Sequence, residues 1–319
     1  MRKIIILLLV GVVGILHANE LDNISNVDFN FLNKEKASYY LSKEDDFINR
    51  LSPFDMSSRM KTSTEVSKED FIKFISLQTL SWNKDEINRI DKILEKIKAK
   101  IGIYNIYFPA TIYLIKTTGF EEGNAAYCRG NSIIVIPEDD LLKNDNQIEE
   151  LLIHEMFHIF SRNNPSIQEK LYSIVGFTKC SELELPETIQ KWKITNPDAS
   201  FFNYYFTSIV HGKELKLMPI LLAKSEYDEV RGDDFFDYLS FLFIGIHIED
   251  EKVTPLVYDN KYFIISPDNA RNYFDLIGNN TTYTIHPEEV LADNFVLLIL
   301  QSSKINTPRI IDKMRIILQ

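Results

Sequence analysis

Two stretches of the chain repeat apolar residues every three or four positions, which is the spacing of an amphipathic helix. Residues 67–82 begin with a serine and an acidic residue three positions later, close to a capping box. Residues 84–101 carry one stripe of isoleucine and leucine, and Gly102 ends it. We therefore predict a helix over each stretch.

The hydrophobic period then changes. Residues 103–116 and 132–137 are β-branched and aromatic runs, the second after a Gly-Asn turn signal, and are predicted to be strands. Residues 146–162 return to helical spacing but are apolar on nearly every side, which indicates a helix in the centre of the protein.

In the second half of the chain, apolar and polar residues follow a less regular pattern. A short helix is expected over residues 166–175, followed by a polar connection and by strand-like runs between residues 203 and 266. Two further helices are expected over residues 287–302 and 307–318. No internal repeat is found, and the mixture of elements predicts an α+β fold.

The chain begins with the pattern of an export signal. Arg2 and Lys3 precede an apolar run from Ile4 to Leu16, and the small residue Ala18 follows at a plausible cleavage site. The run is shorter than the roughly 20 residues that a membrane-spanning helix needs. We expect residues 1–18 to be a cleaved signal peptide, with an uncleaved anchor as the alternative, and the mature protein to be periplasmic or secreted without stable membrane insertion.

Residues 19–64 are polar with short apolar patches. We interpret them as an irregular leader that packs against the body or serves as a removable prosegment.

The formal charge of −11 includes Arg2 and Lys3, so the mature chain carries −13, which disfavours nucleic acid and anionic lipid as partners. Two cysteines, Cys128 and Cys180, allow one disulfide or two buried thiols, and both alternatives stay open.

Three ionisable residues interrupt the apolar helix at 146–162: His154, Glu155 and His158. Residues four apart share a helix face, so the two imidazoles can bind one zinc ion. Glu155 can hold and deprotonate a zinc-bound water, as in the His-Glu-x-x-His motif. The alternative is that all three lie on a solvent-exposed face, but burial of this helix would instead require a common partner for them.

A hydrolytic zinc site needs a third protein ligand and one open position. The metzincin pattern has a glycine and a histidine where this chain has Ser161 and Asn164, which excludes that group. Downstream, Glu289 and Asp293 lie one helical turn apart. With these motifs the sequence resembles the gluzincin metallopeptidases, the thermolysin-like group. The resemblance implies that Glu289 completes the zinc site and that Asp293 hydrogen-bonds a ligand histidine.

The alternative for Pro287, Glu288 and Glu289 is ordinary helix-start chemistry, with a proline first and acids at the positive end of the dipole. Glu288 has no aspartate four residues later, so Glu289 is the predicted ligand. About 130 residues separate His158 from Glu289, more than in the best-known gluzincins. The strand-rich segment between them would then be an insertion.

The resemblance implies a zincin-like fold of two lobes around the active-site helix. The N-terminal lobe would span residues 65–162 and the C-terminal lobe residues 163–319, including the strand-rich insertion. By the same analogy residues 130–137 would form an edge strand that pairs with an extended peptide; a plain core strand is the alternative.

Tyr283 and His286 are candidates for stabilising the oxyanion, with a solvated or capping role as the alternative for each. The aminopeptidase signature Gly-x-Met-Glu-Asn is absent, which slightly favours an endopeptidase. The sequence thus predicts an exported zinc metallopeptidase with a peptide or protein substrate and Zn²⁺ as its cofactor. The alternative is a non-catalytic metal-binding or interaction protein of the cell envelope.

Overall fold

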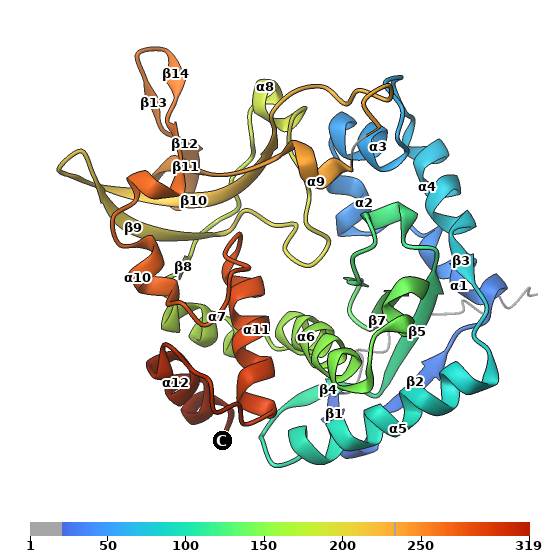
Figure 1. Ribbon diagram of the computed structural model, residues 1–319. Helices are drawn as coiled ribbons and strands as arrows, with labels where there is room; N and C mark the ends of the chain where they lie inside the picture. Colours follow the sequence, from blue (N-terminus) through green and yellow to red (C-terminus); the bar gives the residue numbers. More distant parts are fainter. Residues whose placement is uncertain (1–20, 233) are drawn as a thin grey trace, which may run out of the picture.

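The computed structural model describes residues 21–232 and 234–319, so the expected signal peptide at residues 1–18 lies outside the described residues. The fold is α+β, as the sequence predicts (Figure 1). Its α-helices are α1 (Lys34–Leu41), α2 (Asp46–Arg50), α3 (Pro53–Arg59), α4 (Lys68–Leu77), α5 (Lys84–Ile101), α6 (Asp145–Asn163), α7 (Pro165–Ile174), α8 (Glu187–Gln190), α9 (Phe235–Tyr238), α10 (Tyr273–Ile277), α11 (Pro287–Ile299) and α12 (Pro308–Leu318). The helices predicted from hydrophobic spacing are all present, and most agree with the expected ends within about three residues. The exception is α4, which ends at Leu77, five residues before the predicted end, because the chain turns there into the short strand β3.

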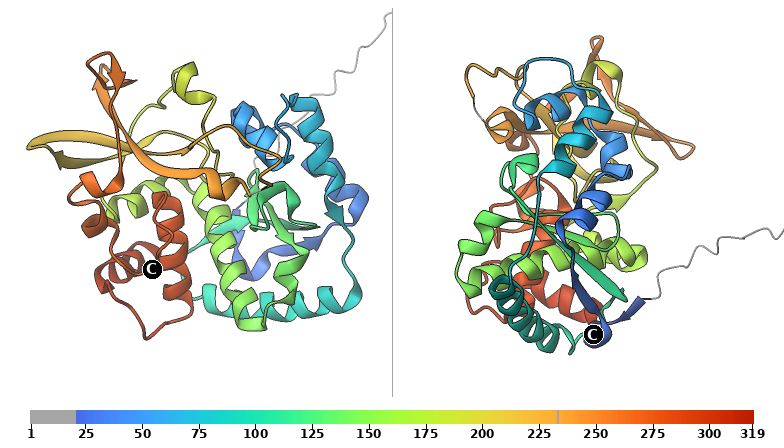
Figure 2. Two further views of the ribbon diagram at one scale, coloured as in Figure 1. Left: turned by 45° about the horizontal axis from the view of Figure 1, so that its top comes forward. Right: turned by 90° about the vertical axis from the view of Figure 1, so that its right-hand side faces the viewer.

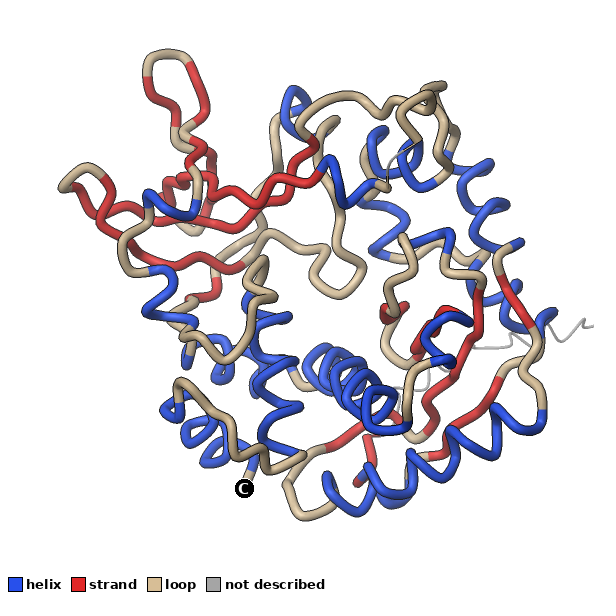
Figure 3. Tube along the Cα trace, viewed as in Figure 1, coloured by secondary structure: helices blue, strands red, loops and turns tan. Residues whose placement is uncertain are grey.

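The strands form two main sheets that occupy separate regions of the molecule (Figure 3). Those of the first half are β1 (Leu21–Asn23), β2 (Asp28–Phe31), β3 (Thr79–Leu80), β4 (Tyr107–Pro109), β5 (Thr111–Thr117), β6 (Tyr127–Arg129) and β7 (Ile133–Pro137). Those of the second half are β8 (Thr178–Lys179), β9 (Tyr204–Val210), β10 (Lys213–Ala223), β11 (Leu239–Glu249), β12 (Lys252–Pro255), β13 (Val257–Tyr258), β14 (Lys261–Tyr262) and β15 (Ile264–Ile265).

The first sheet has the order β2-β5-β7-β6, with β3 also pairing with β5. Strands β2, β5 and β7 are parallel, and β6 runs antiparallel to β7. Of the two alternatives for residues 130–137, the core strand is therefore confirmed and the edge strand is wrong, because β7 lies between β5 and β6. The short strand β6 forms that edge, and it was missed because three residues are too few to show a strand period.

The leader packs against the body, as one of the two alternatives expected, but it is regular in structure and not irregular. Residues 21–64 supply β1, β2 and helices α1 to α3, and β2 pairs in parallel with β5. Apolar side chains of this segment, including Ile24, Leu41 and Phe54, are buried. The short apolar patches of the sequence thus face the body of the protein. Removal of the segment as a prosegment stays a prediction.

The second sheet is antiparallel, with the order β12-β11-β10-β9-β8 and β15 paired with β11. Its strands lie between α7 and α11 in the chain, which is where a strand-rich segment was expected. The hairpin of β13 and β14 projects from it. Figure 2 shows this sheet lying over the group of helices that includes α7, α11 and α12.

Helix α6 lies in the middle of the protein, between α5 and α11 (Figure 1). Asn144 and Gln147 begin it with a capping box, each side chain accepting a hydrogen bond from the other's backbone N–H. Its apolar residues join one core with both sheets, which explains why the sequence is apolar on nearly every side. The packing of α6 on α11 brings together two segments that are about 130 residues apart.

Cys128 is buried and Cys180 is half-buried, and both are free thiols. Of the two alternatives left open by the sequence, the structure therefore has no disulfide between them. Within residues 21–232 and 234–319, no helix combines the length and the apolar character that crossing a membrane requires.

Candidate metal centre

The side chains of His154 and His158 project from the same face of α6, with ring centroids 4.8 Å apart. The carboxylate of Glu289, from α11, lies opposite them: its Oε2 is 3.2 Å from His154 Nε2 and 3.6 Å from His158 Nε2. Donor atoms about 2.0 to 2.1 Å from a tetrahedral zinc are separated by about 3.3 to 3.4 Å. The two distances from Glu289 Oε2 to the histidine nitrogens are therefore close to those between the ligands of one zinc ion.

Asp293 lies one turn after Glu289 and contacts the outer nitrogen of His154. Its Oδ1 is 2.9 Å from His154 Nδ1, and the hydroxyl of Thr281 donates a hydrogen bond to its Oδ2. A carboxylate in this position fixes the tautomer of a ligand histidine, so that Nε2 is left for the metal. The contact is the one that the resemblance to the gluzincins led us to expect.

Glu288 performs the same task for the other histidine, which the sequence analysis did not foresee. Its Oε1 is 3.1 Å from His158 Nδ1, and its Oε2 accepts hydrogen bonds from Ser161 Oγ at 2.9 Å and Tyr172 Oη at 2.5 Å. The Glu288 side chain is 2% exposed. Helix-start chemistry is therefore an incomplete account of this residue, because its carboxylate is directed at His158.

We expect Glu288→Gln to lower the affinity for zinc by about 10-fold to 100-fold, since a partner of this kind orients the ligand histidine. Competition with a chelator of known affinity measures the change. Glu150→Gln is the matched control, because Glu150 lines the same cleft on α6 but is exposed and holds no histidine. Equal zinc affinities in the two variants would contradict the role of Glu288.

Glu155 is 3% exposed and lies beside Cys128, whose thiol donates to Glu155 Oε2 at 3.3 Å. Burial raises the pKa of Glu155 to about 7, and the negative charge of Asp198 is the second largest cause of this rise. A carboxylate with a pKa near neutral is suited to accept and return a proton at physiological pH. Burial also raises the pKa of the Cys128 thiol well above its ordinary value, so this thiol stays protonated.

The histidines hold protons strongly when only carboxylates surround them. Burial by itself would lower the pKa of His158, but the charges of Asp198 and Glu289 and the hydrogen bond to Glu288 outweigh it and raise that pKa to about 9. The pKa of His154 is raised well above its ordinary value in the same way, by Asp293 and Glu289. A metal ion needs neutral imidazoles, so its binding would release these protons.

Two residues of the loop between α8 and β9 also reach the centre. Asn196 Nδ2 donates a hydrogen bond to Glu289 Oε1 at 2.6 Å. Potential ligand atoms of Asp198, His158 and Glu289 all lie within 4.8 Å of one another. No local sequence pattern points to Asn196 or Asp198, because a loop residue has no periodicity that relates it to a site.

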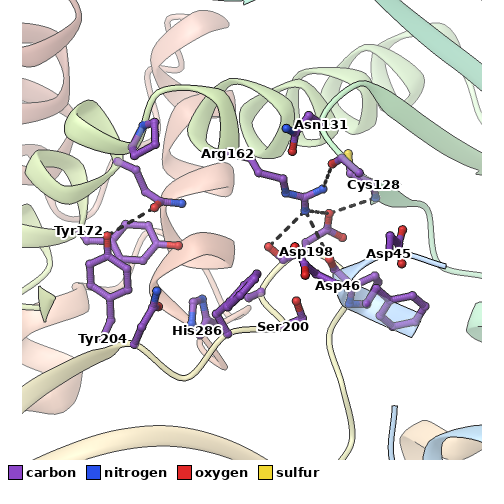
Figure 4. Close-up of a pocket in the computed structure, with 18 of the residues that line it drawn as sticks. Asp45, Asp46, Cys128, Asn131, Arg162, Tyr172, Asp198, Ser200, Tyr204 and His286 are labelled. Atoms are coloured by element: carbon purple, nitrogen blue, oxygen red, sulfur yellow. Dashed lines mark hydrogen bonds and ion pairs between the residues drawn. The ribbon is translucent and has the colours of Figure 1, made fainter. Parts of the chain in front are cut away.

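The two oxyanion candidates lie in different places. The Tyr283 ring stacks beside His154, with centroids 6.3 Å apart, and lines a cleft of about 910 Å³ together with His154 and Glu289. His286 instead caps α11: its Nδ1 accepts the backbone N–H of Glu288 at 3.1 Å. The His286 side chain lines a different cavity, shown in Figure 4, and burial lowers its pKa to about 4.

In comparisons with known proteins, no family model, no curated protein and no solved structure matches this chain. The chemistry of the centre is therefore inferred from its own geometry.

Proposed function

We propose that the protein is a zinc-dependent metallopeptidase of the gluzincin type, with a zincin-like arrangement of two lobes around α6. The observation that carries the proposal is the position of Glu289 Oε2, within 3.6 Å of the Nε2 atoms of both His154 and His158. Two imidazoles and one carboxylate are the protein ligands of several catalytic zinc sites. The export signal expected at residues 1–18 would place the activity in a periplasm or outside the cell.

Zinc, when bound, supplies a positive charge that lowers the pKa of water and polarises a substrate carbonyl. Glu155 takes a proton from the attacking water and later gives it to the leaving amine. Asp293 and Glu288 each accept a hydrogen bond from one ligand histidine and keep its Nε2 directed at the site. The chain thus supplies three ligands, a proton carrier and two orienting carboxylates.

Tyr283 is the better placed of the two oxyanion candidates. It lines the same cleft as His154 and Glu289, where its hydroxyl can donate to the carbonyl oxygen that becomes negative during the reaction. The ring nitrogen of His286 that caps α11 is already occupied by the N–H of Glu288. A capping role therefore accounts for His286.

The neighbouring edge strand favours an extended peptide as substrate. Residues 124–126, which lead into β6, line the cleft together with His154. An edge strand has unpaired N–H and C=O groups that can hydrogen-bond to an extended chain. The absence of an aminopeptidase signature slightly favours cleavage within a chain, so we propose an endopeptidase.

One observation favours the second candidate, a non-catalytic metal-binding protein of the cell envelope. Asp198 offers a fourth possible ligand, because its carboxylate lies within 4.8 Å of the ligand atoms of His158 and Glu289. A zinc site with four protein ligands is closed and is typical of structural zinc. Glu155 beside the histidines favours the enzyme, because a purely structural site has no need of a proton carrier.

The proposal is tested by the metal content of the purified mature protein, measured by inductively coupled plasma mass spectrometry. We expect about one zinc per chain in the wild type and a sharply lower content in Glu289→Ala, because a third ligand is lost. Glu150→Ala is the matched control, since Glu150 is exposed in the same cleft and should keep the zinc. A wild-type protein that takes up no zinc, even when zinc is supplied, would overturn the proposal.

A further inference from the structure

Residues 196–200 form a segment that separates two hollows of the protein. On one side is the cleft of about 910 Å³ that contains His154 and Glu289. On the other side is the cavity of about 310 Å³ in Figure 4, which is lined by Arg162 and Tyr204. Asp198 lines both hollows. Asp198 therefore lies at the boundary between the two hollows.

The carboxylate of Asp198 is held in a fixed position. Its Oδ1 accepts a hydrogen bond from the backbone N–H of Cys128 at 3.0 Å and forms an ion pair with Arg162 at 3.4 Å (Figure 4). The side chain is 6% exposed. Throughout residues 21–232 and 234–319, no hydrogen bond to its Oδ2 is found, so this oxygen is available to a metal ion.

Asp198 faces two groups of site residues at once. Its ligand atom lies within 4.8 Å of those of His158 and Glu289, and also within 4.8 Å of those of Cys128 and Glu155. Asp198 is therefore close both to predicted ligands and to the predicted proton carrier.

The segment also uses hydrogen-bonding groups that a substrate would need. The N–H of Cys128 belongs to the edge strand β6 and points away from β7, because it donates to Asp198. Asn196 Nδ2 donates to Glu289 Oε1 at 2.6 Å. The side chains of Asn196 and Asp198 thus occupy hydrogen-bonding groups of the site and of the edge strand.

Contacts at both ends keep the segment in place. Arg162, one helical turn after His158, donates to the backbone oxygen of Pro197 at 3.3 Å. Before the segment, Thr195 donates its N–H to Asp55 Oδ1 at 2.8 Å, and Thr195 O accepts from Arg59 at 2.9 Å. The position of Asp198 is therefore determined by α3 and α6 together.

We propose that Asp198 is a fourth metal ligand, which closes the site until residues 196–200 move away. This inference rests on the proposed zinc site. With His154, His158, Glu289 and Asp198 as ligands no position is left for a substrate. Displacement of the segment would open the fourth position and free the N–H of Cys128 for a peptide.

The test uses the cobalt-substituted full-length mature protein and acetohydroxamate, a small molecule that binds a metal only at an open position. We expect acetohydroxamate to leave the visible absorption spectrum of the wild type almost unchanged and to shift that of Asp198→Ala. If the closed form exceeds the open form tenfold, the apparent affinity for acetohydroxamate rises about tenfold when Asp198 is removed. Asp198→Asn keeps the shape of the side chain and serves if the alanine variant does not fold.

Asp46→Asn is the matched control, because Asp46 lines the same cavity and is exposed. It should behave as the wild type. Equal binding of acetohydroxamate to the wild type and to both Asp198 variants would overturn the fourth-ligand inference and leave the zinc site standing. A wild type that binds neither cobalt nor zinc would overturn both, and metal analysis of the same samples separates the two results.

Discussion

Glu155→Gln is expected to retain zinc and to lose peptide hydrolysis by about 10²-fold to 10⁴-fold, the usual contribution of a positioned acid or base. Glutamine has nearly the same shape and can still accept a hydrogen bond from Cys128, but it cannot take a proton from water. Its metal content should equal that of the wild type, because Glu155 is not a predicted ligand. The rate is measured with a library of internally quenched peptides.

The hydrolysis assay is carried out with two parent proteins, the wild type and Asp198→Ala, because Asp198 is proposed to close the site. Glu155→Gln is therefore compared with its parent both in the wild type and in Asp198→Ala. Glu150→Gln, on an exposed position of the same helix, is the control and should keep the parent's rate. Unchanged turnover of Glu155→Gln in both backgrounds would show that another group carries the proton.

Arg59→Met is expected to lower the free energy of unfolding by about 3 to 5 kcal/mol, the cost of removing one partner from a buried ion pair. The Arg59 side chain is 0% exposed and lies 2.7 Å from Asp55 Oδ1 and 2.6 Å from Glu122 Oε1. Methionine fills a similar space but leaves two carboxylates buried without their cation. Urea unfolding at neutral pH, followed by circular dichroism, measures the loss.

Arg315→Met is the matched control, because Arg315 pairs with Asp312 on the surface, where both side chains are well exposed. Such pairs contribute about 1 kcal/mol or less. If Arg59→Met also costs less than about 1 kcal/mol, the buried cluster does not join α3 to the rest of the protein. The same variant should loosen residues 196–200, since Arg59 holds the backbone oxygen of Thr195.

Helices were the part of the fold that could be predicted best. Helix α5 spans Lys84–Ile101, as its single apolar stripe and Gly102 indicated, and α6 differs from the expected helix by one residue at each end. Their signals are local: spacing at three or four residues, a cap and a terminating glycine. The edge of the first sheet could not be decided from the sequence, because the order of strands depends on contacts that spacing along the chain does not encode.

The candidate site, like the fold, has features that local spacing predicts and others that depend on tertiary packing. The placement of His154, Glu155 and His158 on one side of α6 follows from helical geometry, and so does the pairing of Glu289 with Asp293. That these two helices pack against each other was an expectation from a resemblance, and the structure brings the residues together. The ligand role of each residue stays a prediction until metal is measured.

The sequence by itself determined the longer helices from α4 onward, the α+β class and the two spaced motifs, because each depends on residues within a few turns of one another. Only the tertiary structure decided that Glu288 holds His158, that β6 is the edge strand and that Asp198 lies among the site residues. These features depend on where a loop crosses a cleft or on which strand pairs with which. Such contacts join residues far apart in the chain, and no local period or cap specifies them.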